Sequence, residues 1–116
     1  MTLGFSSVTG LPPMTVPFDE YVQVPGRAFA PFPATHHTIT GHVVETDGDR
    51  ATLHAHVRAG HRVPEGRAGG GPDRWMVAGF YDNEAIRPPH GRRLSSVRLT
   101  ATHQENAHLS GPAPVI

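Results

Sequence analysis

Most of the nine histidines in this sequence of 116 residues fall between residues 35 and 61. Imidazole titrates near neutral pH and can both accept and donate a proton, so histidines held at one place can act as acid and base. The chain has no cysteine, which excludes a thiolate nucleophile, a thiolate metal site and a disulfide framework. The candidate chemistry is therefore proton transfer, or metal binding, by imidazole.

Residues 35–61 have the pattern of two long strands joined by a tight turn. In the second strand apolar residues alternate with polar ones, which gives one apolar face. That face holds Ala51, Leu53, Ala55, Val57 and Ala59. The same alternation places His61 on the apolar face and places His54 and His56 on the polar one. In the first strand, Ile39 and Val43 share a face with His37, whereas His36 and His42 point the other way.

The turn decides whether the apolar faces of these two strands coincide. A two-residue Asp47-Gly48 loop sets odd positions opposite even ones, whereas a three-residue loop over 46–48 pairs Glu45 with Asp49 and sets odd opposite odd. Face matching favours the longer loop, because a slip of one residue would turn one apolar set toward water. His37 and His61 then both face inward. With His37 opposite Val57, they stand roughly 13 Å apart on a straight strand, too far to bond directly.

The remaining chain predicts one α+β domain over residues 1–116, built on a curved antiparallel sheet of about four long strands with one short helix. Before the hairpin we expect a short strand within 1–7, a helix over Pro17–Val24 that is capped by Thr15 and ended by Pro25-Gly26, and an irregular stretch over 27–33. After the hairpin we expect a flexible loop over 62–73, a strand over 74–87, a turn over 88–91, a strand over 92–104 and a flexible tail over 107–116. A helix of ~8 residues, about 12 Å long, cannot cover strands of roughly 40 Å. The missing cover could be a partner chain or a segment absent from this chain.

Charge and hydropathy indicate the expected partners and location of the chain. Lys plus Arg equals Asp plus Glu, which gives no indication of a nucleic-acid or anionic-membrane partner. No run approaches ~18 apolar residues and the first residues lack the pattern of a signal peptide, so we expect a soluble, cytoplasmic protein. A sheet face without a cover favours a homodimer.

Two groups of short motifs, in order along the chain, resemble the SnoaL-like branch of the nuclear transport factor 2-like superfamily. The first group is Thr35-His36-His37, the Glu-x-Asp-Gly-Asp-x-Ala turn over 45–51, and His61 at the end of the second strand. The second is Gly-Phe-Tyr-Asp-Asn-Glu over 79–84, then Arg87 and Gly91. Each motif is loose, but their order and spacing over residues 30–106 are fairly specific. Relatives in this branch include scytalone dehydratase, polyketide cyclases and ketosteroid isomerase.

The resemblance implies a cone-shaped half-barrel with a ligand pocket inside, no cofactor, and acid/base roles for His37 and His61. The reaction class would be dehydratase, isomerase or cyclase, by proton removal next to a carbonyl of a small hydrophobic, aromatic or polyketide-like molecule. This chain departs from the family in two ways. The helical segment that carries a tyrosine and an aspartate in dehydratase-like members is expected to be missing, and Arg92 stands where a tryptophan is usual. A non-catalytic ligand-binding or pairing module is therefore the alternative.

Further candidate ligand contacts follow from strand alternation. Tyr81 shares a side with Trp75 and could line a pocket or pack in the core. Val57 stands opposite His37 in the expected register, and His103 continues an apolar stripe with Val97. The segment 82–84 with Arg87 has the pattern of an exposed charge ladder. His37 and His61 themselves could instead be packed histidines bonded to backbone carbonyls.

A metal site is the less favoured reading of His54-x-His56. Gly48 followed by these two histidines matches the start of the cupin signature, in which same-face histidines bind a metal. The glutamate and the C-terminal motif of that signature are missing, and alternation turns both histidines to the polar face. We therefore predict no metal. The glycines at 69–71 lack the residues of a phosphate-binding loop.

Overall fold

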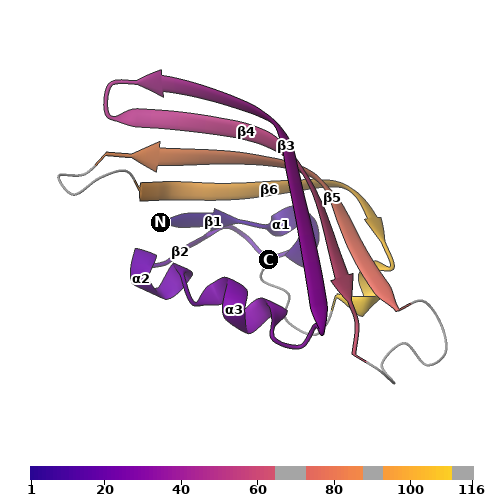
Figure 1. The fold of residues 1–116 in the computed structure, drawn as a ribbon. Coiled ribbons are helices and arrows are strands. Elements are labelled where there is room, and N and C mark those ends of the chain that lie inside the picture. Colours follow the sequence, from indigo (N-terminus) through magenta and orange to yellow (C-terminus); the bar gives the residue numbers. More distant parts are fainter. Residues whose placement is uncertain (65–72, 88–92, 111–116) are drawn as a thin grey trace.

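Four long strands make up most of one strongly curved sheet (Figure 1). The computed structural model describes residues 1–64, 73–87 and 93–110. The elements are β1 (Thr2–Gly4), α1 (Ser6–Thr9), β2 (Met14–Thr15), α2 (Phe18–Tyr21), α3 (Val24–Phe29), β3 (Ala34–Asp47), β4 (Arg50–Arg62), β5 (Arg74–Ile86), β6 (Arg93–Glu105) and the 3₁₀ helix η1 (Ala107–Leu109). The sheet order is β2-β1-β6-β5-β4-β3.

The predicted α+β class with a curved, unclosed sheet is confirmed, with six strands instead of about four. The two strands beyond the four long ones are short. β1 is the short strand expected within residues 1–7 and lies parallel to β6, with Leu3 beside Val97, whereas β2, which was not expected, pairs with β1. The segments 65–72, 88–92 and 111–116, which include most of the expected loop, the expected turn and most of the tail, lie outside the described residues. No helix in the described ranges is long and apolar enough to cross a membrane.

The helical segment on the inner side of the curved sheet is longer than predicted (Figure 1). We expected one helix ending at Pro25-Gly26, but α2 ends at Tyr21 and α3 runs through both residues to Phe29. Pro25 lies in the first turn of α3, where its missing N–H has no intrahelical partner to lose. Thr15 does not cap the helix, because it belongs to β2. The segment expected to be irregular thus places Phe29 over the sheet.

The β3–β4 hairpin has a different turn from the predicted one. Gly48 and Asp49 form a two-residue loop, with Gly48 at φ +59° and Asp47 paired with Arg50. This loop sets odd positions of one strand opposite even positions of the other. A bulge between Thr40 and Val43, with Gly41 at φ +66°, then shifts the register by one residue.

Beyond that bulge the apolar faces of the two strands do coincide. Ile39 is paired with Val57, so the apolar faces match as predicted. The register that matches them is produced by the bulge and not, as expected, by a three-residue turn. The bulge also separates Val43 from Ile39, because Val43 pairs with His54 on the outer face. The expectation that Ile39, Val43 and His37 share one face was therefore wrong for Val43.

Bulges also change the phase of β6. Thr102 is an extra residue between Ala101, paired with Gly79, and His103, paired with Ala78. Gly79 is needed at this position, because a Cβ there would overlap the Thr100 carbonyl oxygen. After the bulge, Gln104 occupies the inner face and accepts a hydrogen bond of 3.1 Å from Trp75 Nε1.

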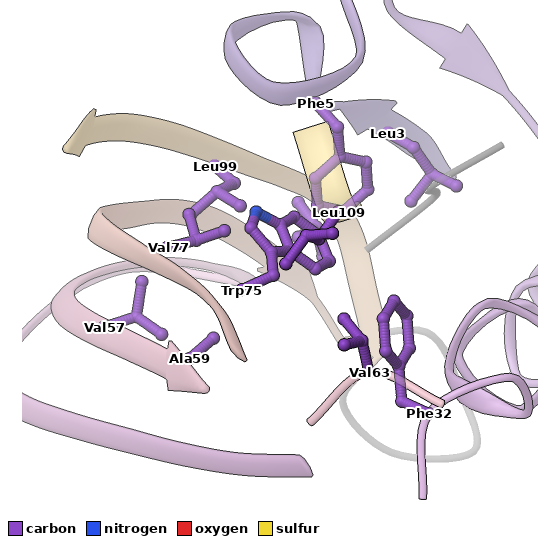
Figure 2. Packing of buried hydrophobic residues seen from close by; sticks show 11 residues of the cluster. Leu3, Phe5, Phe32, Val57, Ala59, Val63, Trp75, Val77, Leu99 and Leu109 are labelled. Carbon is purple, nitrogen blue, oxygen red and sulfur yellow. The ribbon is translucent and has the colours of Figure 1, made fainter. Parts of the chain in front are cut away.

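The core lies between the inner face of the sheet and the N- and C-terminal segments (Figure 2). Trp75 is fully buried at its centre, close to Leu109 of η1, and Val57, Ala59, Val77 and Leu99 line the sheet side. Residues 107–110 were expected to be part of a flexible tail. Instead they form a turn whose Leu109 is only 5% exposed, because it covers apolar surface at the start of β5, beside Trp75.

Candidate functional site

A cavity of about 250 Å³ lies between α2–α3 and the inner face of the sheet. One wall comes from the helical side and the other from β3, β5 and β6. The lining residues are mostly apolar or aromatic, with one imidazole, two phenols and one amide among them: Phe5, Tyr21, Val24, Pro25, Phe29, His37, Tyr81, Asn83, Leu94 and Val97. An apolar cavity with a few convergent polar groups is the usual form of a small-molecule site.

His37 brings an imidazole to the wall of this cavity. It lies on the inner face of β3, opposite Ala59, and its ring meets Phe29 of α3 edge to face at a centroid distance of 5.2 Å. Burial lowers the pKa of His37, and a charge on the neighbouring His36 lowers it further. His37 is therefore a neutral imidazole at neutral pH and can accept a proton.

His61 lies behind His37 and is enclosed by aromatic rings. It is 1% exposed and stacks on Trp75 with ring centroids 4.2 Å apart. Phe29 and Phe32 also contact the ring, at centroid distances of 5.5 and 5.3 Å. This packing fixes the plane of the imidazole and keeps it in a dry environment.

The protonation state of His61 follows from its single hydrogen bond. Its Nδ1 lies 3.2 Å from the Trp75 carbonyl oxygen, which can only accept, so Nδ1 carries the proton. Burial lowers the pKa of His61; the bond to Trp75 opposes this shift, and a charge on His37 adds to it. The neutral ring thus has a lone pair on Nε2, and that buried atom has no hydrogen-bond partner.

The two histidines are much closer than the sequence predicted. Their rings meet edge to face with centroids 5.5 Å apart, whereas a straight strand in the expected register would separate them by roughly 13 Å. The observed register places His37 opposite Ala59 and not Val57, two residues nearer to His61. No hydrogen bond joins the two rings in the described structure, as expected.

Two phenols and one amide complete the polar lining. Burial raises the pKa of Tyr81, and Tyr21 raises it further, while burial alone raises the pKa of Tyr21. Both hydroxyls therefore remain protonated and can donate hydrogen bonds. Asn83 Oδ1 is buried without a partner, although an unpaired buried polar atom costs stability. It can accept a hydrogen bond from a molecule in the cavity.

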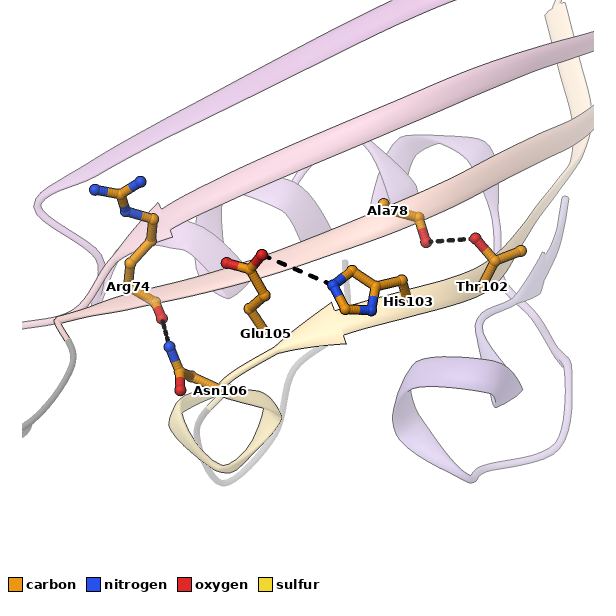
Figure 3. Close-up of polar contacts among 6 residues, drawn as sticks. All are labelled: Arg74, Ala78, Thr102, His103, Glu105 and Asn106. Carbon is orange, nitrogen blue, oxygen red and sulfur yellow. Dashed lines mark hydrogen bonds and ion pairs between the residues drawn. The ribbon is translucent and has the colours of Figure 1, made fainter.

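The remaining residues predicted to contact a ligand lie in three different environments. Tyr81 lines the cavity, as the strand pattern allowed. Trp75 is buried beneath His61, and Val57 is a core residue that is 5% exposed, so neither lines this cavity. The placement of His103 on the inner apolar stripe was wrong. The Thr102 bulge turns it outward, where its side chain is 61% exposed and Nε2 lies 3.7 Å from Glu105 (Figure 3).

His54 and His56 lie on the outer face, as predicted, with ring centroids 5.7 Å apart. His54 Nδ1 is 2.8 Å from Asp82 Oδ1. In the part of the chain that the structure describes, no three histidine, aspartate or glutamate side chains are arranged to hold a metal ion.

The ligand contacts expected from the sequence did not include Asn83, Tyr21 or Phe29, which also line the cavity. Asn83 was assigned to an exposed charge ladder, although alternation from Tyr81 places it on the inner face. Tyr21 lies within the segment expected to be a helix, but nothing in the sequence indicated that it lines a cavity. Phe29 lies in α3, a helix that was not predicted because two prolines stand nearby.

Comparisons with known proteins agree with this architecture. The family model described as SnoaL-like domain matches residues 3–98. The crystal structure of the Kfla4162 protein from Kribbella flavida is 63% identical, with a TM-score of 0.88 over 95% of this chain and 74% of that protein. No curated protein sequence matches.

More distant structures share the fold alone. A proposed scytalone dehydratase from Novosphingobium aromaticivorans is 15% identical, with a TM-score of 0.66 over 90% of this chain and 65% of that one. Hexachlorocyclohexane dehydrochlorinase LinA-type3 from Novosphingobium barchaimii is 14% identical, with a TM-score of 0.66 over 90% and 66%. The chain thus spans about two thirds of the length of these two proteins. Given the family match over most of the sequence, the chain belongs to the SnoaL-like family and has the nuclear transport factor 2-like fold.

Proposed function

We propose that this chain binds a small aromatic molecule in the cavity beside His37 and removes a proton from it, as a lyase, isomerase or cyclase that needs no cofactor. The observation that carries the proposal is the pair of inward histidines. His37 lines the cavity and His61 lies 5.5 Å behind it, and burial lowers both pKa values. A neutral, partly desolvated imidazole is a suitable general base near pH 7.

The size and lining of the cavity support the substrate class. A volume of about 250 Å³ is below the range of drug-sized sites, roughly 300–1,000 Å³, and suits one or two fused rings. Phe5, Phe29 and Leu94 provide the apolar wall. Tyr81 can donate to a carbonyl oxygen, and Asn83 can accept from a hydroxyl, so a hydroxylated aromatic ketone meets each polar group with its complement.

The proposed step is proton abstraction next to a carbonyl. His37 takes the proton from carbon, and the electron pair left on carbon moves toward the carbonyl oxygen, where a tyrosine hydroxyl stabilises the developing charge. In a dehydration, the pair then forms a carbon–carbon double bond, the C–O bond breaks, and the leaving hydroxide takes the proton from imidazolium as water. In an isomerisation, the proton returns at another carbon. His61 and the rings around it keep the environment of His37 dry. The Nε2 atom of His61 itself stays unprotonated.

A non-catalytic ligand-binding protein is the second candidate. Among the described residues that line the cavity there is no carboxylate to orient a histidine or to assist the base. In a protein that only binds its ligand, the unpaired atoms of His61 and Asn83 would contribute to the affinity and specificity of ligand binding and to nothing else. Both candidates require the same cavity, and they differ in whether a proton moves.

Thermal shift and hydrogen exchange together test this proposal. A panel of hydroxylated aromatic ketones, polyketide fragments and steroids is screened for a rise in melting temperature, because a ligand of the folded state stabilises it by mass action. Each hit is then incubated in D₂O, and deuterium incorporation next to the carbonyl is followed by NMR. We expect exchange with the wild type, loss of exchange in His37→Asn, and wild-type exchange in His56→Asn, which alters an exposed histidine on the outer face of the sheet.

Stabilisation without exchange would favour the binding protein. The absence of any stabilising ligand would contradict both candidates.

A further inference from the structure

The long edge strand β3 has no partner on its outer side in the described structure. It ends the sheet order, and all its pairing is with β4. The opposite edge is the two-residue β2, which offers little to pair with. By contrast β3 is 14 residues long, contains neither lysine nor proline, and exposes Ile39, Val43 and Val44 at 44%, 54% and 59%. A long edge strand that exposes apolar side chains, and whose outward N–H and C=O groups have no partner strand in the described structure, is a template for another strand.

We propose that β3 pairs antiparallel with β3 of a second copy of this chain, about a two-fold axis that passes between Gly41 and His42. The inference rests on the residue pattern of the two arms of β3, on either side of the bulge. It does not depend on the proposed function.

The bulge makes the two arms of β3 compatible with each other. In the arm before the bulge, Ile39 faces inward, opposite Val57, and Thr40 faces outward, opposite His56. In the arm after it, Val44 faces inward, opposite Leu53, and Val43 faces outward. A two-fold axis perpendicular to the sheet keeps each face on its own side. Each odd position of the first arm must therefore meet an even position of the second.

The position of the bulge selects one register. β3 bends strongly along its length (Figure 1), and two bent strands lie side by side over their whole length only when the bends coincide. With the axis between Gly41 and His42, Ile39 meets Val44 of the partner subunit on the inner face. On the outer face Thr40 meets Val43 of the partner subunit, and His36 meets Asp47 of the partner subunit.

This register is complementary as well as symmetric. It pairs exposed apolar residues with each other and sets an imidazole N–H donor opposite a carboxylate, and the symmetry forms each contact twice. A slip of one residue would bring inner residues opposite outer ones. A slip of two would move the bends apart and set Ile39 against His42 of the partner subunit.

Cross-linking tests the register directly, because the chain has no cysteine of its own. Directly opposite residues have Cβ atoms roughly 4.5–5.5 Å apart and diagonal ones roughly 7–8 Å, so oxidation discriminates between them. The single variants Thr40→Cys and Val43→Cys are mixed and oxidised. We expect a disulfide-linked heterodimer on a non-reducing gel, and little product from either variant alone or from Thr38→Cys mixed with Val43→Cys.

Sedimentation equilibrium of the unmodified chain tests the association itself. We expect a dimer for the wild type and at least a tenfold weaker dimer for Val44→Lys, which places two charges at the paired edge. The matched control is Val22→Lys, which is equally exposed at 57% but lies beside α2. Circular-dichroism melts establish that both variants fold.

Three results would overturn the proposal. These are a wild type that is monomeric at all concentrations, a dimer whose affinity is unchanged by Val44→Lys, and preferential cross-linking of Thr38→Cys with Val43→Cys.

Discussion

His37 and His61 lie edge to face on neighbouring strands, with ring centroids 5.5 Å apart. Burial lowers the pKa of each ring, and a charge on His37 lowers that of His61 further. Two positive charges at this distance in a dry site would repel strongly. The pair is therefore stable as two neutral imidazoles, which is the state that a general base requires.

The stability of the fold should fall as the pH is lowered through the range in which these two histidines titrate. Their folded pKa values lie below the unfolded value of 6.5, so in that interval the unfolded chain binds more protons than the folded one. The free energy of unfolding should decrease from about pH 7 downward and level off once both folded pKa values are passed.

Urea unfolding at a series of pH values measures this dependence. NMR titration of the ring carbons supplies the folded pKa values, and the same resonances in concentrated urea supply the unfolded reference. Folded values at or above the unfolded ones would contradict the neutral pair.

Replacing His61 by phenylalanine should separate packing from chemistry. The ring stacked on Trp75 is kept, while the bond to the Trp75 carbonyl and the unpaired Nε2 are both removed. We expect the free energy of unfolding to change by less than about 1 kcal/mol, since a lost hydrogen bond and a relieved orphan atom largely offset each other. Deuterium exchange of a bound ketone should be largely retained, because phenylalanine keeps the environment of His37 equally dry and His37 is the base.

The control for this variant is His61→Ala, which leaves a cavity among the aromatic rings. It should cost about 3 kcal/mol, as other large-to-small core substitutions do. Equal losses of stability in both variants would mean that the imidazole hydrogen bond, and not the ring volume, holds this part of the core.

Strand alternation predicted most of the inner face of the sheet. His61 and Val57 are buried and His54 is on the outer face, because a period of two persists along the whole of β4, which has no bulge. The prediction was wrong where a bulge changes the phase, at Val43 in β3 and at His103 in β6. An extra residue in one strand leaves no clear mark in the hydropathy pattern, although Gly41 and Gly79 are hints of irregular backbone.

The site was less predictable than the fold. The identity of the inward histidines follows from alternation, but their distance depends on register and curvature, which the pattern of one strand does not specify. Phe29 approaches both histidines from α3, and the contact is made between segments that the sequence analysis treated as unrelated. Asn83 was missed because its charged neighbours dominated the interpretation of that strand.

Gly79→Ala should be strongly destabilising. A Cβ at this position would overlap the Thr100 carbonyl oxygen and lie 2.9 Å from Ala101 Cα, both backbone atoms that cannot move aside without breaking the β5–β6 ladder. We expect a loss of about 3 kcal/mol or more, at the upper end of overpacking effects. Gly60→Ala in β4 is the matched control: its nearest neighbour would be the His36 carbonyl oxygen at 3.9 Å. Its stability should be unchanged or slightly raised.

Asn83 should limit the stability of the ligand-free protein. Asn83→Leu removes a buried oxygen that has no partner and leaves an apolar side chain of similar size, so we expect the free energy of unfolding to rise by about 1 kcal/mol. Binding of a hydroxylated ligand should weaken at least tenfold, because its donor would lose the acceptor. Urea unfolding measures the first effect and isothermal calorimetry the second.

Gln104→Leu is the same chemical change with the opposite expected result. Gln104 accepts the 3.1 Å hydrogen bond from Trp75 Nε1, so the substitution leaves the indole N–H of a buried residue unpaired and should cost about 1–3 kcal/mol. Ligand binding should be largely retained, because Gln104 does not line the cavity. If Asn83→Leu were as destabilising as Gln104→Leu, the amide of Asn83 would have a structural partner such as water, and its role as a ligand acceptor would be wrong.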